Sequence, residues 1–139
     1  MTMQYNPSVP FPEPVKYLDD MGFWDGVQKK QLSFQKCKEC GTLAHPPRPM
    51  CPKCHSFEKE WVASQGKGKV YSWVTYREPN HGAFKTPYSV VLVEMDEGVR
   101  VVANVVGMKP EDIKIGMPVE VVFEDVAPGI TIPKFKKVG

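Results

Sequence analysis

Four cysteines constrain this chain more than any other feature of its sequence. They are the only cysteines present, and they form two C-x-x-C pairs, Cys37 with Cys40 and Cys51 with Cys54, separated by ten residues. Each such turn offers two sulfur ligands from one tight backbone loop, and two turns complete the tetrahedral shell that Zn²⁺ prefers. The spacing therefore predicts a single four-thiolate site, with zinc as the metal.

Other uses of the same cysteines stay open at this point. Iron in a rubredoxin-like site takes almost the same ligands, and C-x-x-C pairs also occur as redox dithiols or disulfides. Disulfides are disfavoured, because neighbouring C-x-x-C cysteines are more often ligands or redox pairs and the first residues show neither the basic nor the apolar region of a secretory signal. A redox dithiol is the weaker rival. Four thiolates leave no position for water or substrate, so the metal is predicted to stabilise the fold without catalysing. His45 and His55 are interpreted as non-ligands for the same reason.

Length and charge narrow the class of protein. The chain has 139 residues and a formal net charge of +2, which suits one or two small globular domains. That charge is too small to indicate nucleic-acid binding by itself. No apolar run approaches the roughly 20 residues that a membrane-spanning helix needs. We therefore expect a soluble protein in a reducing cytoplasm, where thiols persist.

Residues 1–31 are predicted to form an arm followed by a short amphipathic helix. Four prolines within the first 14 residues keep the arm extended. Asp19 and Asp20 then suit a helix start, although Gly22 and Gly26 each weaken such a helix by about 1 kcal/mol. Apolar residues follow at near-helical spacing, at Tyr17, Met21, Trp24 and Val27.

Two adjacent aromatic residues of this helix, Phe23 and Trp24, allow two interpretations. They cover the ribbon or barrel of this same chain, or they dock another subunit. The sequence favours neither role, so both residues are candidate partner-docking residues.

Residues 32–60 are predicted to form a zinc ribbon around the cysteines. Its apolar core is too small to fold alone, so the free energy of metal ligation is expected to supply the missing folding energy. Removal of the metal should therefore unfold this segment.

Residues 61–139 change character, because β-branched and aromatic residues dominate and turn residues interrupt them at short intervals. A short helix begun by Pro110 is expected between the third and fourth of five strands. This order is that of an OB-fold, and an SH3-like barrel is the rival. The predicted fold class is mainly β, with a short N-terminal helix and zinc ribbon before a five-stranded OB-fold barrel. The expected strands span residues 69–77, 88–95, 99–106, 118–125 and 130–136.

Several segments together resemble the DUF35 family over nearly the whole chain. They are FWDGVQKKQLSFQKCKECG, HPPRPMCPKC, EWVASQGKGKVYSW, PYSVVLVEMDEG and IGMPVEVVFED. The resemblance implies an N-terminal helix and a rubredoxin-like zinc ribbon joined to a C-terminal OB-fold. His55 departs from the pattern, because it replaces the glycine expected after the second cysteine pair.

The same resemblance implies a function. Similar proteins are small non-catalytic subunits of acyl-CoA enzymes and bind thiolase-superfamily partners. Their settings include archaeal hydroxymethylglutaryl-CoA synthesis, steroid side-chain aldolases, phloroglucinol acylation and the thiolase of anaerobic toluene degradation. In these proteins the OB-fold contacts CoA or acyl-CoA and bridges subunits, and we expect the same of this chain.

The residues themselves agree that catalysis lies elsewhere. The sequence contains no G-x-S-x-G, no H-E-x-x-H and no complete G-x-G-x-x-G motif, and all its cysteines are assigned to the metal. The loop between the first two barrel strands is the candidate binding site, since long loops on rigid barrels often carry binding. Arg77 and Lys85 suit the phosphates of CoA, and Phe84 suits pantetheine or a groove on the partner. A solvated loop with scattered charges is the simpler alternative.

Two other functions compete with this interpretation. A single-stranded nucleic-acid module would stack bases on Tyr71, Trp73 and Tyr76, which otherwise belong to the barrel core. The electrostatic footprint for that function is weak, because basic residues are dispersed apart from the tail lysines Lys134, Lys136 and Lys137. A rubredoxin-like electron-transfer protein is third, and it would require iron in the four-cysteine site.

Overall fold

The structure, a computed structural model, describes residues 4–138, so the first three residues of the expected arm and Gly139 of the expected barrel lie outside the described residues. A 3₁₀ turn at Leu18–Asp20 leads into helix α1, Met21–Gln28. The ribbon strands are β1 (Ser33–Cys37), β2 (Leu43–Ala44) and β3 (Lys59–Ala63). The barrel strands are β4 (Lys67–Tyr76), β5 (Tyr88–Met95), β6 (Arg100–Val105), β7 (Pro118–Ala127) and β8 (Ile130–Lys137), with a 3₁₀ turn at Pro110–Asp112 between β6 and β7.

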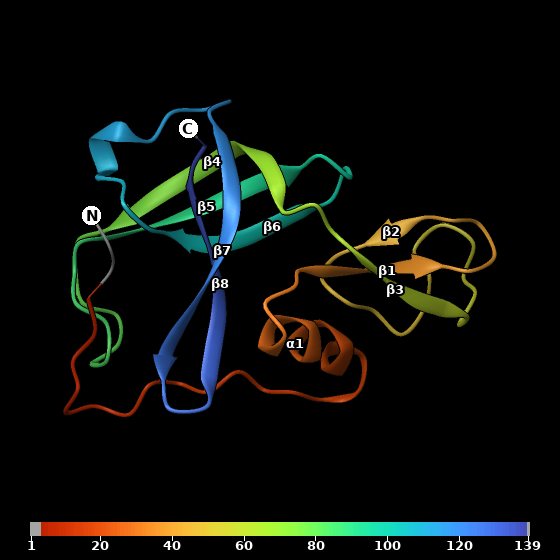
Figure 1. The fold of residues 1–139 in the computed structure, drawn as a ribbon, viewed down its shortest axis with the longest axis horizontal. Coiled ribbons are helices and arrows are strands. Elements are labelled where there is room, and N and C mark those ends of the chain that lie inside the picture. The colour runs from red at the N-terminus through yellow and green to blue at the C-terminus, as the bar shows by residue number, and fades with distance from the viewer. Residues whose placement is uncertain (1–3, 139) are drawn as a thin grey trace.

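The ribbon is an antiparallel sheet in the order β2-β1-β3 (Figure 1). Strand β3 pairs with the whole length of β1, from Ser33 opposite Ala63 to Cys37 opposite Lys59. The ribbon sheet therefore runs across the expected boundary between residues 60 and 61. Just beyond it, the carboxylate of Glu97 accepts hydrogen bonds from the Ser64 hydroxyl at 2.9 Å and the Gln65 amide at 2.8 Å. These bonds fix the link between ribbon and barrel.

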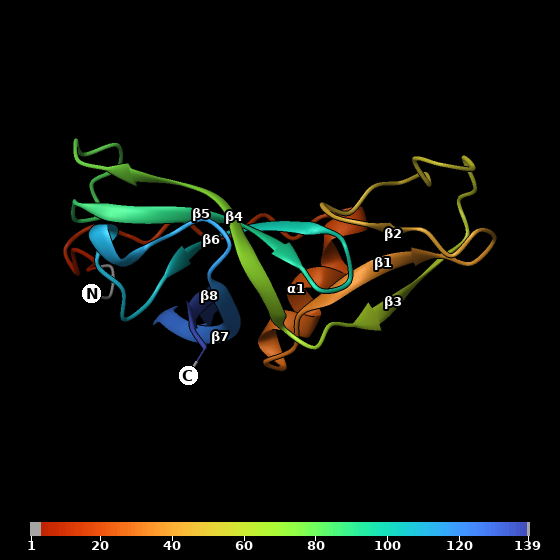
Figure 2. The same ribbon diagram turned by 90° about the horizontal axis from the view of Figure 1, so that it is seen from above.

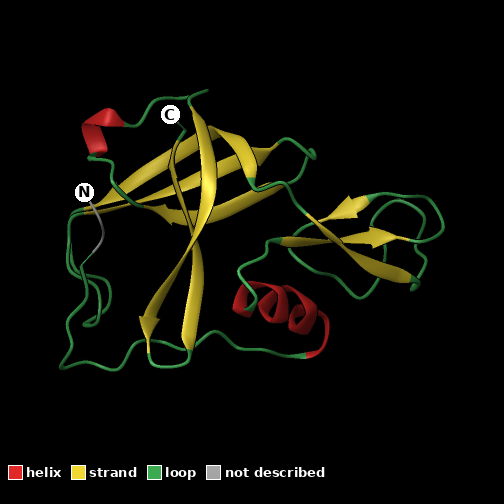
Figure 3. Cartoon of the chain, viewed as in Figure 1, coloured by secondary structure: helices red, strands yellow, loops and turns green. Residues whose placement is uncertain are grey.

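The second sheet closes into a barrel in the order β4-β5-β6-β8-β7 (Figure 3). Strands β6 and β8 pair in parallel, and every other neighbouring pair in the barrel is antiparallel. A five-stranded barrel of this order, with a helical turn between its third and fourth strands, is an OB-fold. The predicted fold class is confirmed.

A single apolar core joins the two sheets through α1. Phe23 and Val27 on α1 and Phe34 on β1 belong to the same buried cluster as Val91 and Phe135 of the barrel. Figure 2 shows the consequence, with the barrel and the ribbon at opposite ends of an elongated molecule and α1 between them. The ribbon therefore gains part of its core from its neighbours.

The apolar stripe predicted for α1 is wrong at its first two positions. Tyr17 is 66% exposed because it precedes the regular helix, and Met21, the first residue of that helix, is 51% exposed. Glycine in this helix has a packing role, since a Cβ at Gly22 would lie 2.2 Å from the ring of Trp61 on β3. Helix α1 can approach β3 this closely only because residue 22 is a glycine, although glycine lowers the stability of the helix.

Candidate metal centre and binding loop

The two cysteine pairs lie in loops with the same backbone geometry. The first follows β1, where the Gly41 amide donates to the Cys37 carbonyl at 2.9 Å, and the second precedes β3, where the His55 amide donates to the Cys51 carbonyl at 3.0 Å. Gly41 has a φ of 77° and His55 a φ of 66°. His55 therefore adopts the left-handed conformation that glycine adopts at the equivalent position of the first loop, at some cost in backbone energy.

The four sulfur atoms form a compact cluster. All of them lie within 4.8 Å of one another, with Cys37 Sγ 3.5 Å from Cys54 Sγ and Cys40 Sγ 3.6 Å from Cys51 Sγ. A tetrahedral ion with metal–sulfur bonds of about 2.3 Å places its ligands roughly 3.8 Å apart. All four cysteines are free, at distances far beyond the length of a disulfide bond. The cluster therefore fits a structural metal ion.

Hydrogen bonds favour the thiolate form that binds a metal at two of the four cysteines. Backbone amides of Cys54 and Lys53 donate to Cys51 Sγ at 3.5 and 3.4 Å, and they lower the pKa of that thiol. Hydrogen bonds with the side chain and backbone of Thr42 lower the pKa of Cys40 to about 6. Deprotonated sulfur is the ligating species, so these hydrogen bonds favour coordination by Cys40 and Cys51. At Cys54 the backbone of Ser56 lowers the pKa, but the neighbouring Cys37 thiol and burial outweigh it and raise the pKa to about 12.

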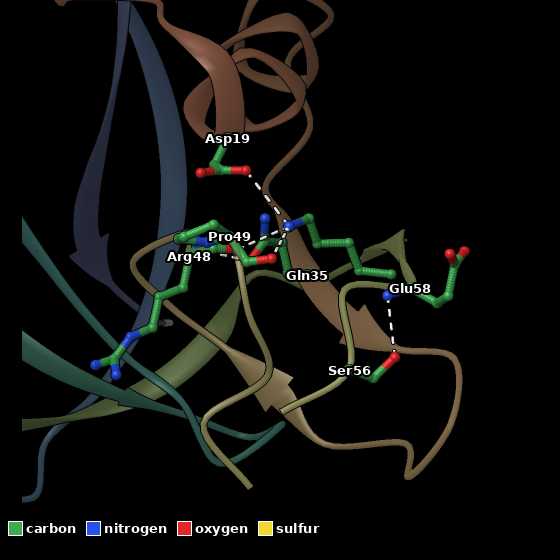
Figure 4. A network of polar contacts seen from close by, with 7 residues as sticks. Asp19, Gln35, Arg48, Pro49, Ser56 and Glu58 are labelled. Carbon is green, nitrogen blue, oxygen red and sulfur yellow. Dashed lines mark hydrogen bonds and ion pairs between the residues drawn. The ribbon is translucent and has the colours of Figure 1, made fainter. Parts of the chain in front are cut away.

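A polar network holds the ribbon against the segment before α1 (Figure 4). The Lys59 ammonium donates to the carbonyls of Arg48 at 2.9 Å and Pro49 at 2.7 Å, and it pairs with Asp19 at 3.4 Å. The side-chain oxygen of Gln35 accepts from the Arg48 amide at 2.8 Å. These contacts fix the proline-rich loop that precedes the second cysteine pair.

His45 belongs to the ribbon core. Its ring lies 5.2 Å from that of Phe23 and 5.5 Å from that of Phe34. Burial lowers the pKa of His45 to about 4, so the ring is neutral at physiological pH. The sulfur cluster described above contains no histidine, and the non-ligand interpretation of His45 and His55 agrees with this arrangement.

The candidate binding loop connects β4 and β5. Arg77 at its start and Lys85 near its end are both exposed, whereas Phe84 is half-buried. Phe84 packs edge-on against Phe11 at 5.5 Å and Tyr5 at 6.1 Å between ring centroids. Contact of these three residues with CoA stays a prediction, and the ring of Phe84 is already partly covered by the arm.

A buried lysine that the sequence did not predict lies beneath the N-terminal arm. Lys134 on β8 is one of the tail lysines named in the sequence, but its side chain has no exposed surface and pairs with Glu124 at 2.9 Å. Its ammonium also donates to the Tyr5 hydroxyl and lies 4.8 Å from that ring's centroid. No local signal marks this position, because Tyr5 is 129 residues away in sequence.

Phe23 and Trp24 pack within the chain. Phe23 is 7% exposed, Trp24 is partly buried against the same core, and their ring centroids lie 5.1 Å apart. This packing agrees with the interpretation in which Phe23 and Trp24 cover this chain's own ribbon and barrel. Docking of another subunit by these two residues stays a prediction.

The aromatic residues of β4 do not all belong to the core, and that part of the sequence interpretation is wrong. Tyr71 is 45% exposed and Tyr76 is 41% exposed, while Trp73 packs against the core. A bulge between Val70 and Ser72 turns Tyr71 outward. The guanidinium of Arg100 covers its ring at 3.8 Å.

Two family models match this chain, one over the ribbon and one over the barrel. A family model described as "ChsH2, rubredoxin-like zinc ribbon domain" matches residues 24–60, and one described as "ChsH2, C-terminal OB-fold domain" matches residues 61–124. Within residues 4–138, no helix has the length and apolar character needed to cross a bilayer.

Two curated relatives differ in the share of their own length that this chain matches. A "Probable enoyl-CoA hydratase alpha subunit" of Thermomonospora curvata is 42% identical over 90% of this chain, which spans only 39% of that protein. A "DUF35 domain-containing scaffold protein" of Methanocaldococcus jannaschii is 42% identical over 74% of this chain and 75% of its own length. The chain thus spans about two fifths of the first relative and most of the second.

A solved structure matches the whole arrangement. A chain of the "Ltp2-ChsH2(DUF35) aldolase" superposes with a TM-score of 0.86 at 41% identity, covering 90% of this chain and 98% of that one. The ribbon, α1 and the barrel therefore keep the same relative placement in both proteins.

Proposed function

Because the chain belongs to the DUF35 family, we propose that it is a non-catalytic accessory subunit that binds a thiolase-superfamily partner and contributes to acyl-CoA binding or to assembly of the complex. One observation carries this proposal. The combined ribbon and barrel match, over 90% of this chain and 98% of the other, a chain of the "Ltp2-ChsH2(DUF35) aldolase", whose name joins a DUF35 protein to a second component. A thiolase, an aldolase and an acyltransferase are all candidate partners, and the partner performs the carbon chemistry.

The metal centre supports a structural role for this subunit. A four-sulfur shell leaves no open coordination position, so the ion holds the ribbon in shape and does not bind substrate. We propose Zn²⁺ as that ion, with iron as the alternative. We propose the cytoplasm as the compartment, since four free cysteines persist where the medium is reducing.

Exposed apolar residues ahead of α1 support partner binding. Val15 is 78% exposed, and Tyr17 and Leu18 are each 66% exposed. Leu18 also has a φ of 45°, a strained conformation for a leucine. Strained, exposed apolar residues clustered in one segment are typical of interaction sites. This segment adjoins Phe23 and Trp24, so the predicted docking region is extended toward the arm.

The experiment is affinity purification of the tagged chain from an extract of its source, with mass identification of bound proteins. We expect a thiolase-superfamily protein, and recovery at least tenfold lower for a Tyr17→Ser, Leu18→Ser variant, since anchor residues typically contribute more than about 1 kcal/mol each. Val102→Ser with Ile115→Ser on the barrel is the matched control, because these residues are 63% and 67% exposed and lie outside the segment before α1. Turnover of a thioester by the isolated chain would refute the proposal.

The contribution to CoA binding has its own test. In the purified complex, Arg77→Ala with Lys85→Ala should weaken CoA affinity about tenfold and reduce its salt dependence, because phosphate contacts are screened by salt. Lys109→Ala with Lys114→Ala removes the same charge from another exposed segment and serves as the control. Unchanged affinity in the first variant would remove the β4–β5 loop from the site. Salt-dependent retention on single-stranded DNA, without a protein partner, would favour the nucleic-acid alternative.

A further inference from the structure

Strand β4 has an open edge along its second half. Its first three residues pair with β7, and Val70 then exchanges backbone hydrogen bonds with Gly116 at 2.7 Å and Met117 at 3.0 Å. Beyond Val70, β4 pairs only with β5, and no strand within residues 4–138 lies on its other side. In Figure 2 this half of β4 runs along the margin of the molecule, with β5 on its inner side.

The hydrogen-bond pattern identifies the backbone groups that this edge presents. Successive residues of a strand direct their amide and carbonyl groups alternately to one neighbour and to the other. The Met95 amide donates to the Val99 carbonyl at 2.8 Å, so odd-numbered residues of β5 bond to β6 and even-numbered residues bond to β4. Even-numbered residues of β4 lie opposite these even-numbered residues of β5. Trp73 and Thr75 therefore direct their backbone groups toward the open edge.

The side chains along this edge suit pairing with another strand. Tyr71, Val74 and Tyr76 are 45%, 54% and 41% exposed. Residues 71–76 include no charged residue and no proline, which are the residues that usually keep an edge strand from pairing. A bulge precedes Ser72, but the pairing with β5 is regular from Ser72 onward. A regular, uncharged edge is thus available to an extended chain.

A second copy of the same strand matches the register of this edge. In a two-fold antiparallel arrangement with its axis at Val74, Trp73 of one copy lies opposite Thr75 of the other. Each such pair exchanges both of its backbone hydrogen bonds, so the free amide and carbonyl groups of Trp73 and Thr75 are all satisfied. The contact is isologous, because the same patch serves both copies.

The side chains of the two copies also complement each other in shape. The two-fold pairing places Tyr76 of each copy directly opposite Ser72 of the other. Ser72 borders an apolar hollow of about 150 Å³ over β4, β5 and β6, which is also lined by Val74, Leu92 and Val102. The partly exposed ring of Tyr76 thus lies at the edge of an apolar hollow on the other copy.

The charges at the ends of the strand permit this pairing. Arg77 of one copy falls opposite Tyr71 of the other, and Lys69 falls opposite Pro79. No like charges therefore lie directly opposite each other, an arrangement that would weaken a strand pair. The chain itself supplies a strand that meets each condition of the edge.

We propose that the chain self-associates through β4, which joins two barrels edge to edge by an antiparallel β4–β4 pair about a two-fold axis at Val74. This contact between copies goes beyond the accessory-subunit proposal and does not depend on it. A single strand pair is smaller than the roughly 1,200 Å² that stable interfaces bury, so the dimer should dissociate on dilution.

Charged residues at the axis test the proposal by sedimentation velocity on the full zinc-loaded chain. Val74→Lys and Val74→Glu each place like charges opposite one another, and each should raise the dimer dissociation constant at least about tenfold. An equimolar mixture of the two variants should restore the dimer, because opposite charges then meet. Val15→Lys and Val15→Glu are the matched controls, since Val15 is 78% exposed but lies in the arm, and they should associate as the unmodified chain does.

Amide hydrogen exchange locates the contact. Exchange at Trp73 and Thr75 should slow as the protein concentration is raised about a hundredfold, because their amides become bonded only in the dimer. The amides of Val74 and Tyr76 already bond to β5, so their exchange should not depend on concentration.

Four results would each overturn the inference. They are a monomer at every concentration, unchanged association in both Val74 variants, no recovery of the dimer on mixing them, and exchange at Trp73 and Thr75 that is independent of concentration. Loss of the dimer in the Val15 variants would assign the contact to the arm instead. Protection of Trp73 and Thr75 by a recovered protein partner, without a dimer of this chain, would assign the edge to that partner.

Discussion

The buried ion pair between Lys134 and Glu124 allows a quantitative test of how the arm and barrel are held together. The Lys134 side chain has no exposed surface, and its ammonium lies 2.9 Å from Glu124. Burial lowers the pKa of Lys134, and the hydrogen bond and charge of Glu124 oppose that shift. Glu124 itself keeps 29% of its side chain exposed. The lysine therefore depends on the glutamate more than the glutamate depends on the lysine.

This asymmetry determines how much each substitution should change the free energy of unfolding. Removing one member of a buried pair costs about 3–5 kcal/mol, because a charge is left without a partner. The partial exposure of Glu124 lets water replace it, so Glu124→Gln should lower the free energy of unfolding by about 2–3 kcal/mol. Lys134→Met removes the charge together with its desolvation cost and keeps the apolar stem. It should cost only about 1 kcal/mol, mainly from the Tyr5 hydroxyl that loses its partner.

The assay is urea unfolding of the zinc-loaded chain at neutral pH, followed by tryptophan fluorescence. The double variant should be about as stable as Lys134→Met alone, which gives a coupling energy of about 2–3 kcal/mol. Glu120→Gln is the control, because the Glu120 side chain is 32% exposed, much like that of Glu124, but pairs at 3.4 Å on the same two strands with Lys136, which is exposed. It should cost less than about 0.5 kcal/mol. Equal and additive effects of Glu124→Gln and Lys134→Met would refute the reasoning.

Further predictions concern the metal, the ribbon core and the barrel. A strong chelator, or Cys51→Ser, should unfold the ribbon while the barrel keeps its β-sheet circular dichroism, and a colourless, zinc-containing preparation would exclude iron. Burial lowers the pKa of His45 from 6.5 to about 4, so the unfolded chain binds more protons between these values. The stabilisation is therefore complete above about pH 6.5, and up to about 3 kcal/mol should be lost by pH 4, relative to a His45→Phe variant without this titration. Gly68→Ala should cost at least about 2 kcal/mol in urea unfolding, because its Cβ would lie 2.5 Å from the Glu94 carbonyl oxygen. Gly82→Ala, whose Cβ has only ordinary contacts with Val9, should be tolerated; equal effects of the two changes would contradict the packing argument.

Much of the fold was predictable because its determinants are local. The spacing of Cys37, Cys40, Cys51 and Cys54 places two ligating turns in the chain, whatever surrounds them. Each barrel strand carries its own β-branched and aromatic residues and is bounded by its own turn residues. The turn at residues 96–98 joins β5 to β6 as expected, with Gly98 at a φ of 95°. Each of these sequence patterns lies within about a dozen consecutive residues.

The candidate sites depend on contacts that no local pattern contains. Lys134 follows Pro133 and precedes the buried Phe135, so alternation along the strand would place it in solvent. It is buried because Tyr5 covers the outer face of β8 at that point. Phe23 was open to two interpretations, because the sequence of a helix does not reveal which surface the helix packs against. In the structure, Phe23 belongs to the core between ribbon and barrel.

Residue types at fixed spacing are enough to predict the four-cysteine cluster, the ribbon followed by a barrel, and the family. The folded chain is needed to show which lysine is buried, where α1 packs, and that the proline-rich arm lies against the β4–β5 loop. The two kinds of feature differ in the distance along the chain between the residues that produce them. Secondary structure is set by neighbours in sequence, whereas burial and cavities are set by segments that meet only after the backbone has folded.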